Sequence, residues 1–100
     1  MTYNFPDHER GDTFKGVGFE LIVNGVAKSL AGATIIMTIA GKEYSTTNGS
    51  LVVTDAPSGK FEFKEQIVSM SPKTHYYEIV FYFSDGSVKT YIEGTWKITA

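Results

Sequence analysis

The 100-residue sequence contains no cysteine, which excludes disulfide bonds, thiolate metal sites and a cysteine nucleophile. It also has no excess of basic residues, because nine Lys and Arg stand against eleven Asp and Glu, a net charge of −2. Nucleic-acid-binding proteins normally carry a basic stripe, so this balance argues against a nucleic-acid partner. No apolar run reaches the length of a membrane span, and the first residues lack the basic and apolar regions of a signal peptide. We therefore expect a protein made in the cytoplasm, without a membrane partner, that could still be incorporated into a virion.

Residues suited to catalysis are also scarce. Only His8 and His75 could serve as the base of a nucleophilic triad, and the chain has no Gly-x-Ser-x-Gly motif near either. The polar stretch 7–12 combines acidic residues with His8, but it matches no known metal-ligand spacing, and we interpret it as a solvated loop. The sequence therefore predicts no catalytic, cofactor-binding or metal-binding residues, and no cofactor.

The sequence is instead rich in the residues of β-structure. Hydrophobic residues make up 42% of the chain and aromatic residues 14%, enough for the core of one domain. Short alternating segments are separated by turn signals, and only residues 65–70 are compatible with a helical turn. This spacing is typical of sandwiches and barrels. We predict an all-β, immunoglobulin-like β-sandwich of about seven to nine antiparallel strands, with residues 1–12 as an N-terminal arm and residues 13–100 as the single domain.

One predicted hairpin organises the chain. Two alternating runs flank Asp85-Gly86, which is a strong signal for a two-residue turn. The resulting pairs are Phe83 with Val88, Phe81 with Thr90, Ile79 with Ile92, Tyr77 with Gly94, and Glu78 with Glu93. Because side chains alternate along a strand, Trp96 shares the apolar face of the hairpin, and we predict that it is buried near Ile79, Phe81 and Ile92. A second turn signal, Asn24-Gly25, completes the prediction that Gly25 and Gly86 adopt positive φ.

The outer face of this hairpin provides a candidate interface. The predicted register sets Val80 against Tyr91 and Tyr82 against Lys89, and Tyr76 extends the line. Three interpretations remain open for such a stripe: cross-strand packing, a protein interface, or a platform for sugar rings. The candidate interface residues are Tyr76, Tyr82, Lys89 and Tyr91.

The same face carries Glu78 opposite Glu93. Paired carboxylates can act on glycosides, but the sequence predicts no cleft around this pair, and we interpret both side chains as solvated. Two requirements separate the remaining functional classes. Sugar binding would require an exposed aromatic platform flanked by Asn, Asp or Arg side chains that donate and accept hydrogen bonds, whereas assembly would require an apolar patch or a free sheet edge.

Two segments of the chain resemble a known family. The first holds Tyr3-x-Phe5-Pro6-Asp7-His8, Gly11-Asp12-Thr13-Phe14, Asn24-Gly25-Val26 and Leu30-x-Gly32-Ala33-Thr34-Ile35; the second holds Tyr76-Tyr77-Glu78-Ile79 and Asp85-Gly86-Ser87-Val88-Lys89-Thr90-Tyr91-Ile92-x-Gly94-Thr95-Trp96. Together they resemble the small immunoglobulin-like modules of phage and prophage tail proteins, in particular the N-terminal domain of the baseplate upper protein. The resemblance implies a structural, non-enzymatic role through contacts with other tail proteins or through self-association. A carbohydrate-binding or adhesive module is the alternative.

Overall fold

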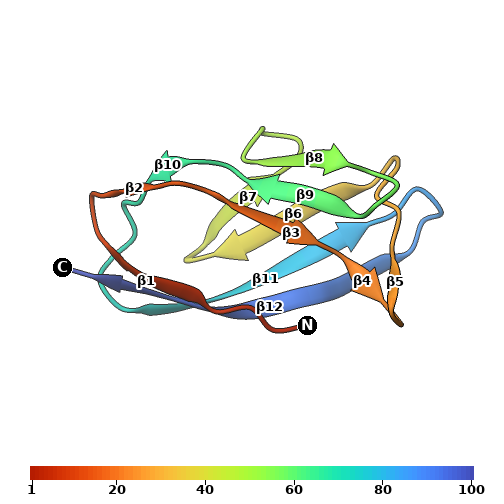
Figure 1. The fold of residues 1–100 in the computed structure, drawn as a ribbon. Helices are drawn as coiled ribbons and strands as arrows, with labels where there is room; N and C mark the ends of the chain where they lie inside the picture. The colour runs from red at the N-terminus through yellow and green to blue at the C-terminus, as the bar shows by residue number, and fades with distance from the viewer.

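A computed structural model describes all residues from Met1 to Ala100 and contains strands joined by turns and loops, with no helix (Figure 1). The strands are β1 (Phe5–Glu9), β2 (Thr13–Phe14), β3 (Val17–Glu20), β4 (Ile22–Val23), β5 (Val26–Ala27), β6 (Thr34–Ile39), β7 (Lys42–Ser45), β8 (Leu51–Asp55), β9 (Lys60–Phe63), β10 (Gln66–Ile67), β11 (Thr74–Tyr82) and β12 (Val88–Thr99). This confirms the all-β class. The count of 12 strands exceeds the predicted seven to nine, because four strands have only two residues and give weak sequence signals. None of the chain forms a helix of the length and apolarity needed to cross a membrane.

The strands form two main layers (Figure 1). One is a five-stranded sheet in the order β1-β12-β11-β6-β7, and the other contains the three-stranded sheet β3-β9-β8. The pairs β2–β10 and β4–β5 extend the second layer, so residues 65–70 contribute a strand and no helical turn. Aromatic contacts join the layers, such as Phe61 with Phe81 at 5.6 Å between ring centroids. The arrangement is compatible with a β-sandwich.

The inner faces of the sheets enclose one core. Strict alternation produces it: on β11, His75, Tyr77, Ile79 and Phe81 are buried, while the residues between them face outward. Trp96 is 1% exposed, which confirms its predicted burial. Its aromatic neighbours are Phe5, Phe14 and Phe63, with the Phe5 ring stacked at 4.6 Å. These come from β1, β2 and β9, and the predicted neighbours Ile79, Phe81 and Ile92 are buried in the same core.

The first twelve residues differ from the predicted arm. Phe5–Glu9 forms β1, which pairs in parallel with β12 at the edge of the five-stranded sheet. Before β1 begins, the Tyr3 backbone N–H already donates to the Glu93 carbonyl oxygen at 3.0 Å. The segment is ordered because Phe5 is buried against Trp96 and because the edge of β12 offers backbone hydrogen bonds. Pro6 is tolerated because β1 is an edge strand. Proline within a segment normally argues against a strand, so the sequence does not predict β1.

The β11–β12 hairpin has the predicted register from its centre to its open end, and a different one near the turn. The pairs Tyr77–Gly94, Glu78–Glu93 and Ile79–Ile92 are confirmed. Towards the turn a bulge at Tyr91 shifts the register, so the predicted partners of Val80, Phe81, Tyr82 and Phe83 are wrong. The observed pairs are Val80 with Thr90, Phe81 with Lys89, and Tyr82 with Val88.

The turn itself explains this shift. The Gly86 N–H donates to the Phe83 carbonyl at 3.0 Å and the Phe83 N–H to the Ser87 carbonyl at 2.9 Å, the pattern of a three-residue loop. Gly86 has φ +90° and Gly25 has φ +78°, so both predicted positive φ angles are confirmed. Asn24 also has positive φ, as a type I′ turn requires, whereas Asp85 does not. The loop at Gly86 is therefore one residue longer than predicted.

Candidate functional site

The outer face of the five-stranded sheet is not covered by another layer. On β11 it presents Tyr76, Glu78, Val80 and Tyr82 in succession. Its composition changes along the strand, from polar side chains around Tyr76 to apolar side chains around Tyr82.

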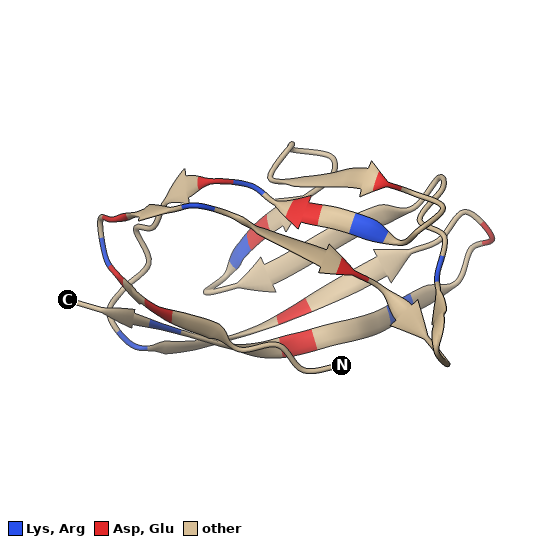
Figure 2. Ribbon diagram, viewed as in Figure 1, with Lys and Arg blue, Asp and Glu red and all other residues tan.

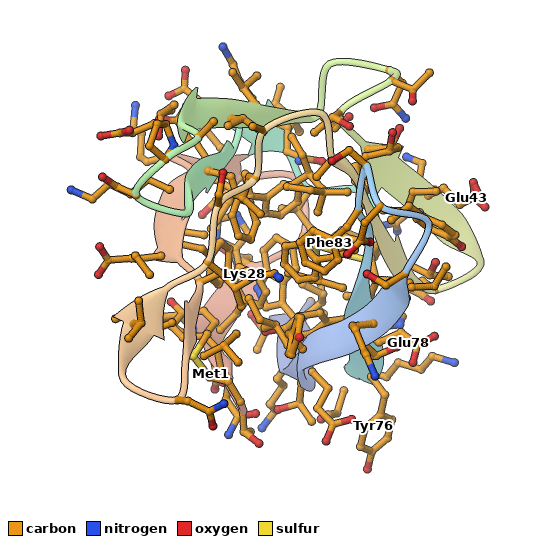
Figure 3. All side chains as sticks on the ribbon, turned by 90° about the vertical axis from the view of Figure 1, so that its right-hand side faces the viewer. Met1, Lys28, Glu43, Tyr76, Glu78 and Phe83 are labelled. Carbon is orange, nitrogen blue, oxygen red and sulfur yellow. The ribbon has the colours of Figure 1, made fainter.

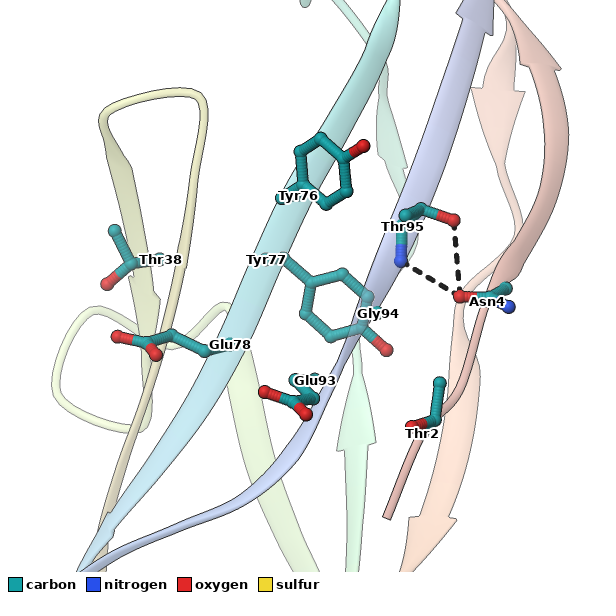
Figure 4. A pocket seen from close by; sticks show the side chains of 9 residues that line it. All are labelled: Thr2, Asn4, Thr38, Tyr76, Tyr77, Glu78, Glu93, Gly94 and Thr95. Carbon is teal, nitrogen blue, oxygen red and sulfur yellow. Dashed lines mark hydrogen bonds between the residues drawn. The ribbon is translucent and has the colours of Figure 1, made fainter.

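The polar half is hollowed into a shallow groove with a volume of about 570 Å³. Four distant parts of the chain build it, namely the N-terminal segment, β6, β11 and β12 (Figure 4). The groove is lined by Thr2, Asn4, Thr38, Tyr76, Tyr77, Glu78, Glu93, Gly94 and Thr95.

The N-terminal wall of the groove depends on Gly94. A Cβ atom at this position would lie 1.9 Å from the Tyr3 carbonyl oxygen, so only glycine lets the segment approach β12. The Asn4 side-chain oxygen then accepts hydrogen bonds from the Thr95 N–H at 3.1 Å and the Thr95 hydroxyl at 3.2 Å (Figure 4). The wall is thus fixed by contacts between residues about ninety positions apart in the chain.

Tyr77, which is buried beneath the groove, also fixes the N-terminal wall in place. Its hydroxyl donates to the Tyr3 carbonyl oxygen. Burial, and then the nearby Tyr3 hydroxyl, raise the pKa of Tyr77 far above its ordinary value. The Tyr77 hydroxyl therefore stays protonated and keeps its hydrogen bond to the N-terminal segment throughout the neutral range.

Two carboxylates lie on the floor of the groove. Glu78 and Glu93 are direct cross-strand neighbours, and both are exposed. Figure 2 shows acidic positions, in red, next to each other on β11 and β12, the strands that carry this pair. The one ion pair in the molecule joins Lys15 to Glu65 at 3.4 Å, so neither groove carboxylate has a cationic partner. The expectation that no cleft surrounds this pair is wrong, because the N-terminal segment raises a wall beside it.

Tyr76 is the most exposed aromatic residue of the site. Its side chain is 79% exposed, and Figure 3 shows it pointing away from the body of the domain. The structure contains no group of three or more His, Cys, Asp or Glu side chains that could hold a metal ion. The groove therefore offers an aromatic ring, carboxylates and hydroxyls as its chemical groups.

The apolar half of the outer face consists of Ile36, Val80, Tyr82 and Val88. Tyr82 and Val88 face each other across the hairpin and are 43% and 54% exposed. Val80 and Ile36 are also paired and are half-buried beside them. These side chains form a continuous apolar surface near the β11–β12 turn.

The four candidate interface residues are therefore not one stripe. Tyr82 belongs to the apolar half, Tyr76 belongs to the groove, and Lys89 is exposed opposite Phe81. Tyr91 lies at the bulge and packs against the core, with its ring 5.9 Å from that of Phe81. Its expected place on the outer stripe is wrong because the bulge turns the side chain inward.

Several residues of this face escaped the sequence reasoning. Ile36 had a signal, since it alternates with the buried Ile35 and Met37 on β6. Val88 had the opposite signal, because its alternation with Ile92 and Trp96 predicts the inner face, whereas the bulge at Tyr91 places it on the outer face beside Tyr82. Thr2, Asn4 and Thr95 had none, because the parallel pairing of the N-terminal segment with β12 leaves no local pattern. Comparisons of the chain with protein-family models, with curated proteins and with solved structures find no match.

Proposed function

We propose that this protein is a non-enzymatic structural module of a phage or prophage tail or baseplate, and that it assembles through the apolar half of its outer sheet face. The observation that carries the proposal is the exposure of Tyr82 and Val88 on an uncovered sheet face. Tyrosine and apolar residues with a polar surrounding are typical of protein interfaces. The resemblance of the two sequence segments to tail modules supplies the biological setting.

The strand order supports an immunoglobulin-like β-sandwich for this module. Immunoglobulin variable-type domains place strands G, F, C and C′ in one sheet and B, E and D in the other. The order β12-β11-β6-β7 corresponds to the first set, and β3-β9-β8 corresponds to the second. No disulfide joins the layers, and Trp96, Phe61 and Phe63 fill the space between them.

Burial of the apolar half against a partner would supply the driving force for assembly. Apolar area removed from water contributes roughly 25 cal/mol per Å², before the cost of association. Tyr82 and Val88 are the most exposed members of this patch and so lose the most area in a contact. We expect self-association or binding to a neighbouring tail protein through these two side chains.

Light scattering over a concentration series tests the contact. The double variant Tyr82→Ser, Val88→Ser removes the exposed apolar groups and should weaken association at least tenfold, while the melting curve stays cooperative. Tyr76→Ser is the matched control, since it removes an exposed tyrosine from the same strand but outside the apolar half. Tyr91 is unsuitable for this test because it packs against the core.

Two results would contradict the proposal. In the first, the wild-type protein stays monomeric at high concentration, and its binding to neighbouring tail proteins is unchanged in the double variant. This result would show that the apolar half takes no part in assembly. The tail assignment has its own check, because it predicts that the coding sequence lies among tail genes. A neighbourhood without any tail gene would contradict that assignment.

A further inference from the structure

We propose that the groove on the polar half of the outer face is a binding site for a neutral carbohydrate, in which a sugar ring stacks on Tyr76 and its hydroxyls bind the carboxylates of Glu78 and Glu93. This site goes beyond the assembly role, since it uses the other half of the face. The groove supplies the exposed aromatic platform that sugar binding requires, and Asn4 is the one flanking residue of the expected types, with Glu78 and Glu93 providing carboxylates in place of aspartate.

The aromatic platform is Tyr76. At 79% exposure its ring contributes little to the core, although most aromatic side chains in this protein are packed against others. The apolar C–H face of a pyranose ring can cover such a ring, in the same way that apolar groups pack on tyrosine elsewhere. Figure 3 shows that no element of the domain lies over Tyr76 on its outer side, so the ring is accessible.

The polar lining suits a ligand with many hydroxyl groups. Ionised carboxylates only accept hydrogen bonds, and Glu78 and Glu93 have no cation or other side chain bonded to them in the structure. Around them stand the hydroxyls of Thr2, Thr38 and Thr95, of which the last is already bonded to Asn4. A sugar provides hydroxyl donors for the carboxylates and acceptors for the threonines. The volume of about 570 Å³ lies within the range of small-ligand sites.

Electrostatics restricts the ligand to a neutral sugar. Two carboxylates directly opposite each other repel an anion, which argues against acidic sugars and nucleic acids in this groove. A lysine or arginine side chain from another protein is the competing occupant. The three threonine hydroxyls favour the sugar, because several hydroxyls distributed around a sugar ring can bond to them as well as to the carboxylates, whereas a single cationic group is already satisfied by the two carboxylates and the ring.

The groove is formed before any ligand arrives. Its N-terminal wall is held by the Asn4–Thr95 hydrogen bonds and by the Tyr77 hydroxyl bond to the Tyr3 carbonyl. A preformed wall lowers the ordering cost of binding. We therefore expect a weak but saturable site, with dissociation constants on the order of millimolar, as is usual for a few contacts of this kind.

Nuclear magnetic resonance titration of the ¹⁵N-labelled protein tests the site. The probes are cellobiose, maltose, lactose and diacetylchitobiose, each added to saturation. At least one should cause saturable shifts confined to the amides of 76–78 and 93–95. Tyr76→Ala should weaken binding at least tenfold, and Tyr76→Phe should retain it because the ring is kept. Tyr82→Ala is the matched control and should bind as wild type, since Tyr82 lies on the same strand outside the groove.

A second titration separates the two occupants. A tetra-arginine peptide is added at low and high salt, because binding to a pair of carboxylates weakens as salt screens the charges. Salt-dependent shifts of the groove amides with this peptide, and none with the four sugars, would overturn the proposal in favour of a cationic partner. The absence of saturable shifts with every sugar, or shifts that persist in Tyr76→Ala, would also overturn it. Neither result bears on assembly through Tyr82 and Val88.

Discussion

Trp96 shows how much of the core depends on a single side chain. It is the largest fully buried residue and stacks on Phe5 from the N-terminal strand. Its indole N–H is buried without a hydrogen-bond partner, which lowers the free energy of unfolding by about 1–3 kcal/mol. The packing of the ring against its neighbours offsets this loss.

Truncation of Trp96 should therefore be costly, and replacement by another ring should be mild. We expect Trp96→Ala to lower the free energy of unfolding by about 3–5 kcal/mol, as large core truncations do. Trp96→Phe should cost much less, because it keeps part of the ring volume and removes the unpaired donor. Urea denaturation measures both. Native tryptophan emission as red as that of the unfolded chain would mean that the ring is in water, contrary to the structure.

Asp85 makes the stability of the hairpin turn depend on pH. The Ser87 hydroxyl and the Ser87 backbone N–H both donate to its carboxylate, at 2.6 and 2.8 Å, and hold its pKa below the usual 3.8. A carboxyl whose folded pKa is lowered stabilises the fold above its unfolded pKa, and this contribution disappears as the pH falls through the folded value.

Asp85→Asn isolates this effect, because the amide can accept the same hydrogen bonds but does not titrate. We expect the stability difference between wild type and variant to be constant from neutral pH down to about pH 5 and to shrink in more acidic solution. Thermal melts across that pH series measure it. A difference that stays the same down to the most acidic point would show that the Ser87 contacts do not depend on the charge of Asp85.

At the scale of elements, β1 is the strand whose place depends on one glycine. The N-terminal segment crosses so close to β12 that a side chain at Gly94 would strike the Tyr3 backbone. The backbone of Gly18, on β3, offers a comparison, because nothing lies within 4 Å of its missing Cβ and neither glycine has positive φ.

Gly94→Ala should thus displace the segment before β1, whereas Gly18→Ala should be nearly neutral. We expect Gly94→Ala to destabilise the protein by about 1–3 kcal/mol, the usual cost of overpacking. Hydrogen exchange should also become faster at the amides of Glu93 and Thr95, which bond to Met1 and Asn4. Equal melting temperatures and equal exchange in the two variants would show that the close approach at Gly94 does not affect stability or the position of the N-terminal segment.

At the scale of the whole molecule, one sheet face presents two surfaces of different chemistry. The groove lies beside the N-terminal segment, and the apolar half lies near the β11–β12 turn. The two share no lining residue, so substitutions in one should add to substitutions in the other without coupling. We expect Tyr82→Ser, Val88→Ser to leave sugar-induced shifts unchanged, and Tyr76→Ala to leave the association constant unchanged. Coupled losses in both measurements would mean that the face acts as one surface.

The sequence by itself determined the features that are encoded within a few residues. Alternation on β9 and β11 determined the all-β class and the inward residues, and the turn signals determined positive φ at Gly25 and Gly86. The burial of Trp96 follows from the same alternation. These predictions succeeded because side-chain alternation and turn geometry act over neighbouring positions. The central pair Ile79–Ile92 matches its prediction for another reason, because the bulge at Tyr91 compensates for the extra residue in the loop at Gly86.

Only the tertiary structure decided the features that join distant parts of the chain. The parallel pairing of β1 with β12 and the Phe5–Trp96 stack link residues about ninety positions apart. The groove exists because of that pairing, so no local pattern could place Asn4 beside Thr95. The bulge at Tyr91 moved one tyrosine from the expected outer stripe to the core side. In each case the deciding energy is the satisfaction of backbone groups and the burial of rings contributed by separate elements.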